Sequence, residues 1–127
     1  MKQAVLDTSF ILTCVKQKID FLNEIKFMGL EILIPASVIK EIKSLSEGRS
    51  GGKFKAEENS KIALKLLEEN CNSFKKIFLP GRNTDKSIIK FAGESKDVVI
   101  ATLDREMKEK IKNPKLIIRG RKKLEII

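Results

Sequence analysis

The chain has 127 residues, of which 42% are hydrophobic and 34% charged, and it carries a net charge of +9 with no histidine. This length fits one domain, and the composition is that of a folded chain rather than a disordered one. The absence of histidine excludes Ser-His-Asp and Cys-His catalysis, a histidine general base and any His-ligated zinc site.

Short β-branched runs alternate with longer helical stretches along the chain. Apolar spacing predicts helices over residues 9–15, 20–28, 37–45, 54–71, 84–93 and 104–111. Short apolar runs predict strands over residues 3–6, 31–34, 74–79, 97–103 and 116–118, with a further edge strand over 124–127. A glycine-rich loop is expected at residues 48–52. This alternation predicts one α/β domain over residues 1–127, a three-layer α/β/α sandwich around a central, mostly parallel sheet.

The two cysteines, Cys14 and Cys71, lie far apart, each in an apolar helical stretch. They form no CxxC pair, so we expect two buried, reduced thiols. No run of residues approaches the length of a membrane span, and the first residues are too short and too soon acidic for a signal peptide. We therefore expect a cytoplasmic protein with no membrane partner.

Positive charge is concentrated near the C-terminus. Residues 108–127 hold eight basic and two acidic residues, a net charge of +6. Such a patch is an electrostatic footprint for phosphate backbones. The alternative interpretation is a solvated, lysine-rich surface.

Four acidic residues occupy comparable places in the predicted fold. Asp7 ends the first strand, Asp104 follows the buried strand, Asp85 opens a helix, and Glu41 lies beside the apolar stripe of another helix. Ligand sites of open parallel sheets form outside the carboxyl ends of the strands, so these carboxylates are expected to converge. Their repulsion would be relieved by a hard cation such as Mg²⁺ or Mn²⁺, which can support phosphodiester hydrolysis.

Each acid also has a simpler interpretation. An aspartate at a strand-to-helix junction commonly caps the helix, which applies to Asp7, Asp85 and Asp104. Thr84 or Asn83 could cap the helix in place of Asp85. Glu41 could be a solvated surface residue. These alternatives are expected to fail together if the acids converge.

Four segments, in this order, resemble the motifs of PIN-domain nucleases. They are Val5-Leu6-Asp7-Thr8-Ser9, residues 34–42 (IPASVIKEI), residues 84–89 (TDKSII) and residues 99–106 (VIATLDRE). The tail over residues 117–125 is similar to the ending of archaeal members related to ribosomal-RNA-processing PIN proteins. The resemblance covers nearly the whole chain.

The resemblance implies a Mg²⁺- or Mn²⁺-dependent endoribonuclease that cleaves single-stranded RNA. Its catalytic and metal-binding residues would be Asp7, Glu41, Asp85 and Asp104, supported by Thr8, Ser9 and Thr102. Thr102 is assigned a hydrogen bond to a carboxylate or to a water of the ion. Some relatives carry a second acid after the position of Asp85, where this chain has Lys86. The number of metal ions, one or two, therefore stays open.

Phosphate contacts are expected from basic residues near the motifs and in the tail: Lys86, Arg105, Arg119, Arg121, Lys122 and Lys123. Without Trp or Tyr, only Phe can stack on bases, so RNA affinity should depend on charge and fall with salt. Many family members pair as homodimers, so the resemblance implies a homodimer. The family includes toxins of toxin–antitoxin pairs and RNA-maturation nucleases, which implies an antitoxin or an RNA-processing protein as partner.

Two other functions compete with this one. A catalytically inactive PIN-fold module that binds RNA or protein stays open, although four converging carboxylates would have no purpose in it. A phosphoacceptor α/β domain would need an aspartate at the end of a central strand. The second and third strands instead end in Ile34-Pro35 and Leu79-Pro80, which argues against that function.

Overall fold

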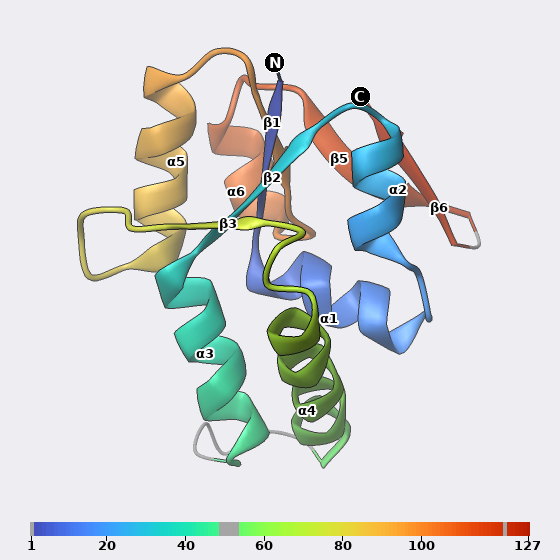
Figure 1. Ribbon diagram of the computed structural model, residues 1–127. Helices are drawn as coiled ribbons and strands as arrows, with labels where there is room; N and C mark the ends of the chain where they lie inside the picture. Colours follow the sequence, from blue (N-terminus) through green and yellow to red (C-terminus); the bar gives the residue numbers. More distant parts are fainter. Residues whose placement is uncertain (1, 49–53, 121) are drawn as a thin grey trace.

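The structure is a computed structural model in which residues 2–48, 54–120 and 122–127 are described (Figure 1). Its strands are β1 (Gln3–Leu6), β2 (Glu31–Pro35), β3 (Lys75–Ile77), β4 (Val98–Ala101), β5 (Lys115–Arg119) and β6 (Lys123–Ile126). Its helices are α1 (Thr8–Lys16), α2 (Phe21–Phe27), α3 (Ala36–Ser46), α4 (Phe54–Glu69), α5 (Thr84–Glu94) and α6 (Arg105–Lys110). The glycine-rich loop expected at residues 48–52 lies almost entirely outside the described residues.

The strands form one sheet in the order β3-β2-β1-β4-β5-β6. The first five are mutually parallel, and β6 runs antiparallel to β5 at the edge. From β1 the chain adds β2 and then β3 toward one edge of the sheet, and it then crosses back to β4. β4 pairs with β1, and Leu6 is the residue paired with Ala101. Right-handed crossovers in opposite directions place α2, which packs against β2, and α5, which packs against β4, on opposite faces of the sheet. The predicted three-layer, mostly parallel α/β/α sandwich is confirmed.

The connection after β1 leads toward one edge of the sheet, and the connection after β4 leads toward the other edge. In doubly wound sheets such a divergence leaves a crevice at the carboxyl ends of the two strands. In doubly wound sheets this switch point is where ligands bind, because the two following crossovers diverge there. Asp7 begins the connection after β1, and Thr102 begins the connection after β4. The motif segments at residues 5–9 and 99–106 therefore meet at one place.

The core explains why these segments form these elements. All four residues of β4 are buried, as a continuous apolar run in a central parallel strand requires. Phe10 of α1 and Phe21 of α2 pack edge to face, with ring centroids 6.4 Å apart. Burial of Val38 and Ile42 fixes α3 against the sheet, and Pro35 precedes its first turn.

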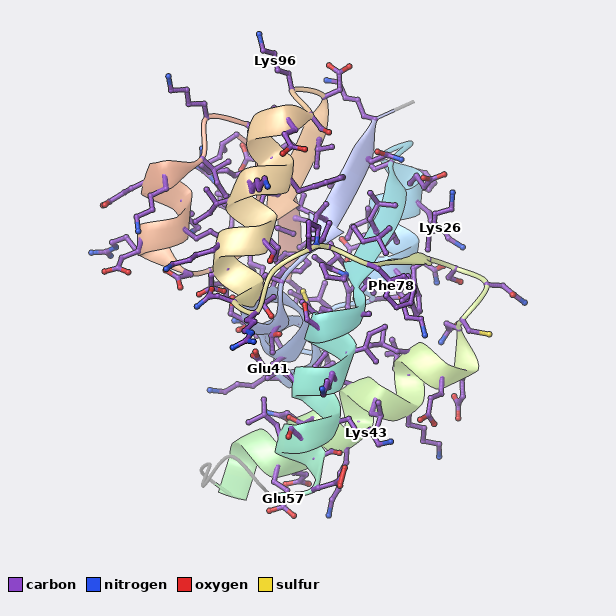
Figure 2. All side chains as sticks on the ribbon, turned by 90° about the vertical axis from the view of Figure 1, so that its left-hand side faces the viewer. Lys26, Glu41, Lys43, Glu57, Phe78 and Lys96 are labelled. Atoms are coloured by element: carbon purple, nitrogen blue, oxygen red, sulfur yellow. The ribbon has the colours of Figure 1, made fainter. Side chains whose placement is uncertain are left out.

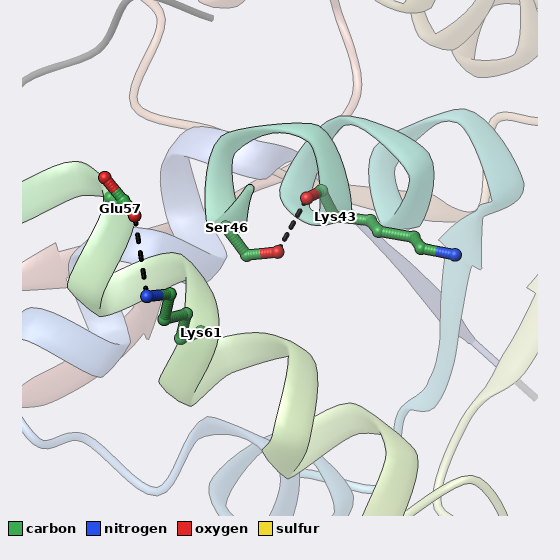
Figure 3. Close-up of polar contacts among 4 residues, drawn as sticks. All are labelled: Lys43, Ser46, Glu57 and Lys61. Atoms are coloured by element: carbon green, nitrogen blue, oxygen red, sulfur yellow. Dashed lines mark hydrogen bonds and ion pairs between the residues drawn. The ribbon is translucent and has the colours of Figure 1, made fainter. Parts of the chain in front are cut away.

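Helices α3 and α4 lie side by side below the sheet (Figures 1 and 3). Figure 3 shows Ser46 Oγ donating a 2.6 Å hydrogen bond to the Lys43 carbonyl, and the 3.4 Å ion pair between Glu57 and Lys61. An exposed pair of this spacing contributes only about 0.2–0.5 kcal/mol. Buried apolar side chains, such as Ala63 and Leu67 of α4, must therefore supply most of the stability of this layer.

Two expectations near α4 are wrong. This helix ends at Glu69 rather than Cys71, so the Cys71 thiol lies exposed, and only Cys14 is the buried thiol that was expected. The strand expected over residues 74–79 is shorter, because it ends at Ile77 and leaves Phe78 exposed. Within the described ranges no helix combines the length and apolar character needed to cross a bilayer.

Candidate active site

Asp7 is the buried centre of the predicted site, with 6% of its surface exposed. Its Oδ2 atom accepts hydrogen bonds from Thr102 Oγ1 at 2.9 Å and from Ser9 Oγ at 3.3 Å. Its side chain makes no capping bond to α1. The capping interpretation of Asp7 is therefore excluded, and Ser9 and Thr102 lie where the resemblance places supporting residues.

Both hydroxyl groups are oriented by the backbone that follows β4. The Asp104 N–H donates to Thr102 Oγ1 at 3.1 Å, and the Leu103 N–H donates to Ser9 Oγ at 3.1 Å. Because an ionised carboxylate can only accept, Thr102 Oγ1 and Ser9 Oγ act as donors toward Asp7 Oδ2 while they accept these backbone N–H groups. The hydroxyl groups of Ser9 and Thr102 thus hold the Asp7 carboxylate in place where β1 and β4 end side by side.

Asp104 and Asp85 begin the two helices on the other side of the crevice. Asp104 is half-buried and caps α6, since its Oδ1 accepts the Met107 N–H at 3.2 Å. That bond uses only one carboxylate oxygen. Asp85 is exposed and does not cap α5, because Asn83 Oδ1 accepts the Lys86 N–H instead. The capping interpretation is thus correct for Asp104 and wrong for Asp85.

Glu41 reaches the same crevice from α3. Figure 2 shows it on α3, close to the N-terminal end of α5. The side chain is exposed at the rim. The buried Thr8 hydroxyl lies beside the Glu41 carboxylate and lowers its pKa, but Thr8 Oγ1 closes no hydrogen bond of standard geometry. Glu41 is therefore solvated, as the simpler interpretation expected, yet it also belongs to the cluster.

The four carboxylates influence one another's ionisation. Burial raises the pKa of Asp7, the bonds from Thr102 and Ser9 lower it in part, and the charge of Asp104 raises it further. Partial desolvation, together with the charges of Asp7 and Asp85, raises the pKa of Glu41. Desolvation and the charges of Asp7 and Asp104 likewise raise the pKa of Asp85. The structure therefore brings all four predicted acids into one mutually repelling group.

The donor set suits a hard divalent cation. It consists of carboxylate and hydroxyl oxygens, which prefer Mg²⁺ or Mn²⁺ to zinc. In the part of the chain that the structure describes, no three acidic or thiol groups approach closely enough to form a complete ligand set by themselves. Mg²⁺ does not need one, because it is usually held by one or two carboxylates and keeps several waters. The buried Thr8 hydroxyl adds a polar atom with spare hydrogen-bonding capacity beside Glu41.

The predicted RNA contacts fall into two separate groups. Lys86 on α5 and Arg105 on α6 are exposed and follow Asp85 and Asp104 directly. The others belong to the β5–β6 hairpin, where Arg119, Lys122 and Lys123 are exposed, and Arg121 lies outside the described residues. Figure 1 shows this hairpin and α5 at opposite sides of the molecule.

The hairpin cations are therefore not the ones nearest to Asp85. Arg119 is also engaged, since its Nε lies 2.6 Å from Glu125. Sequence reasoning missed two cations that lie near Lys86. Arg82 and Lys90 line one open pocket with it. Each lies four residues from Lys86 along the chain, and the helical spacing of Lys86 and Lys90 is the signal that could have found Lys90.

Comparisons with known proteins show which sequences this chain resembles. The family model described as a PIN-like domain matches residues 4–123. Ribonuclease VapC4 of Methanocaldococcus jannaschii is 30% identical over 132 residues, which cover 99% of this chain and 97% of that protein.

Solved structures show the same fold. The PIN domain endonuclease Utp24 matches with a TM-score of 0.75 at 22% identity, over 98% of this chain and 90% of that one. PAE2754 from Pyrobaculum aerophilum matches with a TM-score of 0.59 at 20% identity, over 90% and 83% of the two chains. The family match over almost the whole length and the relative at 30% identity show that this chain belongs to the PIN-like domain family, the nuclease family that its sequence resembles.

Proposed function

We propose that this chain is a Mg²⁺- or Mn²⁺-dependent endoribonuclease that cleaves single-stranded RNA at the carboxyl ends of β1 and β4. The observation that carries the proposal is the electrostatic coupling of Asp7 with Glu41, Asp85 and Asp104. Four repelling carboxylates at a switch point are costly in a merely structural site, and a bound cation would offset that cost. The ribonuclease relative supports RNA as the substrate.

Asp7, Asp85 and Asp104 would hold the ion, and the hydrogen bonds from Thr102 and Ser9 would keep the Asp7 carboxylate in place. The chemistry that such an ion supplies is activation of water at neutral pH and neutralisation of charge on the phosphate. Glu41 stands at the solvent-facing rim with a raised pKa, so its carboxylate is suited to orient the attacking water and to accept its proton.

The preference for single strands follows from the shape of RNA. Side chains cannot read the deep, narrow groove of an RNA duplex, whereas an unpaired strand can be drawn over an open crevice. A homodimer and an antitoxin or RNA-processing partner stay predictions that follow from the resemblance. A cytoplasmic location stays a prediction from the sequence composition.

The test is cleavage of a labelled single-stranded RNA with Mn²⁺ by the natural protein and by Asp7→Asn. We expect Asp7→Asn to lose at least about 100-fold in rate, because metal-assisted charge stabilisation is worth several kcal/mol. Asp20→Asn is the matched control, since Asp20 is exposed at the start of α2 and outside the cluster.

Chelation by EDTA should abolish cleavage, and the duplex form of the same RNA should stay intact. Equal product from the natural protein and Asp7→Asn would assign the cleavage to a contaminant and contradict the proposal. RNA binding without cleavage in Mn²⁺ would instead favour the inactive binding module.

A further inference from the structure

An open pocket of about 410 Å³ lies at the N-terminal end of α5. The loop before α5 and the first two turns of the helix form it, and three cationic side chains line it: Arg82, Lys86 and Lys90. We call these three residues the α5 cations. All three are exposed, and within the described part of the chain none of them forms an ion pair. Three unpaired like charges in one concave site create a positive potential that attracts an anion.

The shape of this pocket is fixed by the loop that closes it. Ser87 Oγ lies 2.7 Å from the Pro80 carbonyl oxygen and 2.9 Å from that of Asn83, so its one proton is shared between them. Gly81 has a φ of +108°, and a Cβ added there would stand 2.8 Å from Ser87 Oγ. Only glycine fits this approach, and the tight loop carries Arg82 to the pocket beside α5.

The pocket and the carboxylate cluster both take residues from the first turn of α5. Lys86 directly follows Asp85, whose charge is coupled to Asp7 and Asp104. The backbone amide of Lys86 is already capped by Asn83, so the pocket depends on side-chain cations rather than on free helix amides. A strand whose one phosphate lies among the α5 cations would therefore have a neighbouring phosphate beside the acids.

We propose that the α5 cations bind a backbone phosphate of the RNA next to the phosphate that is cleaved. This inference rests on the proposed function, and it assigns roles to Arg82 and Lys90 and to the conformation of the loop. It also separates the α5 cations, as a built subsite, from the β5–β6 hairpin cations on the opposite side of the molecule.

The first test measures binding, in EDTA, of a single-stranded RNA with a 5′-hydroxyl end, so that cleavage plays no part. The triple variant Arg82→Ala, Lys86→Ala, Lys90→Ala is compared with Lys96→Ala, Lys110→Ala, Lys112→Ala. The control lysines line a separate pocket of about 350 Å³ at the other end of α5, so both variants lose three positive charges.

If one neutralised phosphate is lost, the plot of log affinity against log salt concentration should become less steep by about 0.7. Relative to 1 M salt, the affinity at 0.1 M should then fall about fivefold. We expect this drop for the α5 cations and a much smaller one for the control. Equal drops in the two variants would mean that only net charge matters, and unchanged affinity would mean that the pocket is not used. Either result overturns the proposal.

A second test leaves every charge in place. Gly81→Ala should distort the loop and weaken RNA binding, whereas Gly93→Ala on α5, where an added Cβ meets nothing within 4 Å, should not. Melting temperatures of both variants establish that each is folded. Unchanged affinity of a folded Gly81→Ala protein would contradict the role of the loop.

Replacing single phosphates by uncharged methylphosphonates locates the bound phosphate. One position beside the cleavage site should weaken binding to the natural protein but cause no further weakening in the α5 triple variant. If only an added 5′-phosphate is sensed, the pocket binds strand ends and the proposal is wrong. If the natural protein binds RNA in this way but never cleaves it, the proposed function fails while the phosphate subsite stands.

Discussion

Thr102 Oγ1 donates a 2.9 Å hydrogen bond to Asp7 Oδ2 across 95 residues of sequence and joins the ends of β1 and β4. The same oxygen accepts the Asp104 N–H, so one hydroxyl links two of the four acids. This bond lowers the pKa of the Asp7 carboxyl against the effect of burial. It therefore favours the charged form that a cation needs, in opposition to burial, which favours the neutral form.

Replacing Thr102 by Val should raise the pKa of Asp7 and weaken its hold on a metal ion. We expect Mn²⁺ affinity or the cleavage rate to fall by about 10- to 100-fold, as is usual when a partner of a metal ligand is removed. Thr102→Ser keeps the hydroxyl and should restore most of both. Titration calorimetry with Mn²⁺ measures the binding separately from activity, and equal Mn²⁺ affinity of the Val and Ser variants would contradict this role.

Asp104 has both a structural and a proposed catalytic role, and two substitutions separate them. Asn can still cap α6, so Asp104→Asn should leave stability within about 0.5 kcal/mol while cleavage is lost. Ala cannot accept the Met107 N–H, so Asp104→Ala should also cost about 1 kcal/mol of unfolding free energy. Urea unfolding and RNA cleavage, measured side by side, check this. Full activity of a stable Asp104→Asn protein would show that the residue is only a cap.

The raised pKa values predict how stability changes with pH when no metal is added. The folded state binds protons at Asp7, Glu41 and Asp85 more tightly than the unfolded chain, whose carboxyl pKa values are about 4. Stability therefore falls as pH rises from about 4 through the raised values and is constant above them. Metal ions should offset the loss at neutral pH.

Asp7→Asn removes one of these groups and isolates its share. In EDTA at pH 7 this variant should be more stable than the natural protein, and the difference should shrink as the pH is lowered toward 4. Urea midpoints over this pH range supply the measurement. A stability difference that grows toward acid pH would have the wrong sign.

The two cysteines should differ strongly in reactivity. Burial is the main cause that raises the pKa of the Cys14 thiol to about 12, whereas Cys71 is exposed. A thiol-specific reagent at pH 8 should therefore label one equivalent rapidly and leave the second unreacted until the protein unfolds. The Cys71→Ser variant should lose the rapid phase, and a rapid phase that persists in it would contradict the burial of Cys14.

Apolar runs and turn residues were enough to predict most of the fold. The continuous run at Val98–Ala101 predicts a strand buried on both faces, and β4 is that strand. Which face of α4 is buried could not be predicted in the same way. The apolar Ile62 is 50% exposed, while Ser60 and Ala63 are buried. Small side chains let α4 approach its neighbours, and this depends on three-dimensional packing that the apolar pattern does not contain.

The acids of the site could be predicted because strand ends of parallel sheets share one edge. The charge pattern was less informative. The positive net charge of residues 108–127 predicts a phosphate-binding surface in the tail. The number of basic residues along the chain, however, does not say which of them lie near Asp85. Arg82 and Lys90 are brought beside Lys86 by the loop at Gly81, whose conformation is a property of the fold.

The seam between β1 and β4 has a consequence for synthesis of the protein. Asp7 is made first, but its partners Thr102 and Asp104 emerge from the ribosome only after β4, which begins at Val98. A nascent chain that ends before Val98 contains Asp7, Glu41 and Asp85 but lacks β4, Thr102 and Asp104, so the junction of β1 and β4 cannot form. The candidate site is therefore incomplete until β4 and the segment after it, which carries Thr102 and Asp104, have been made.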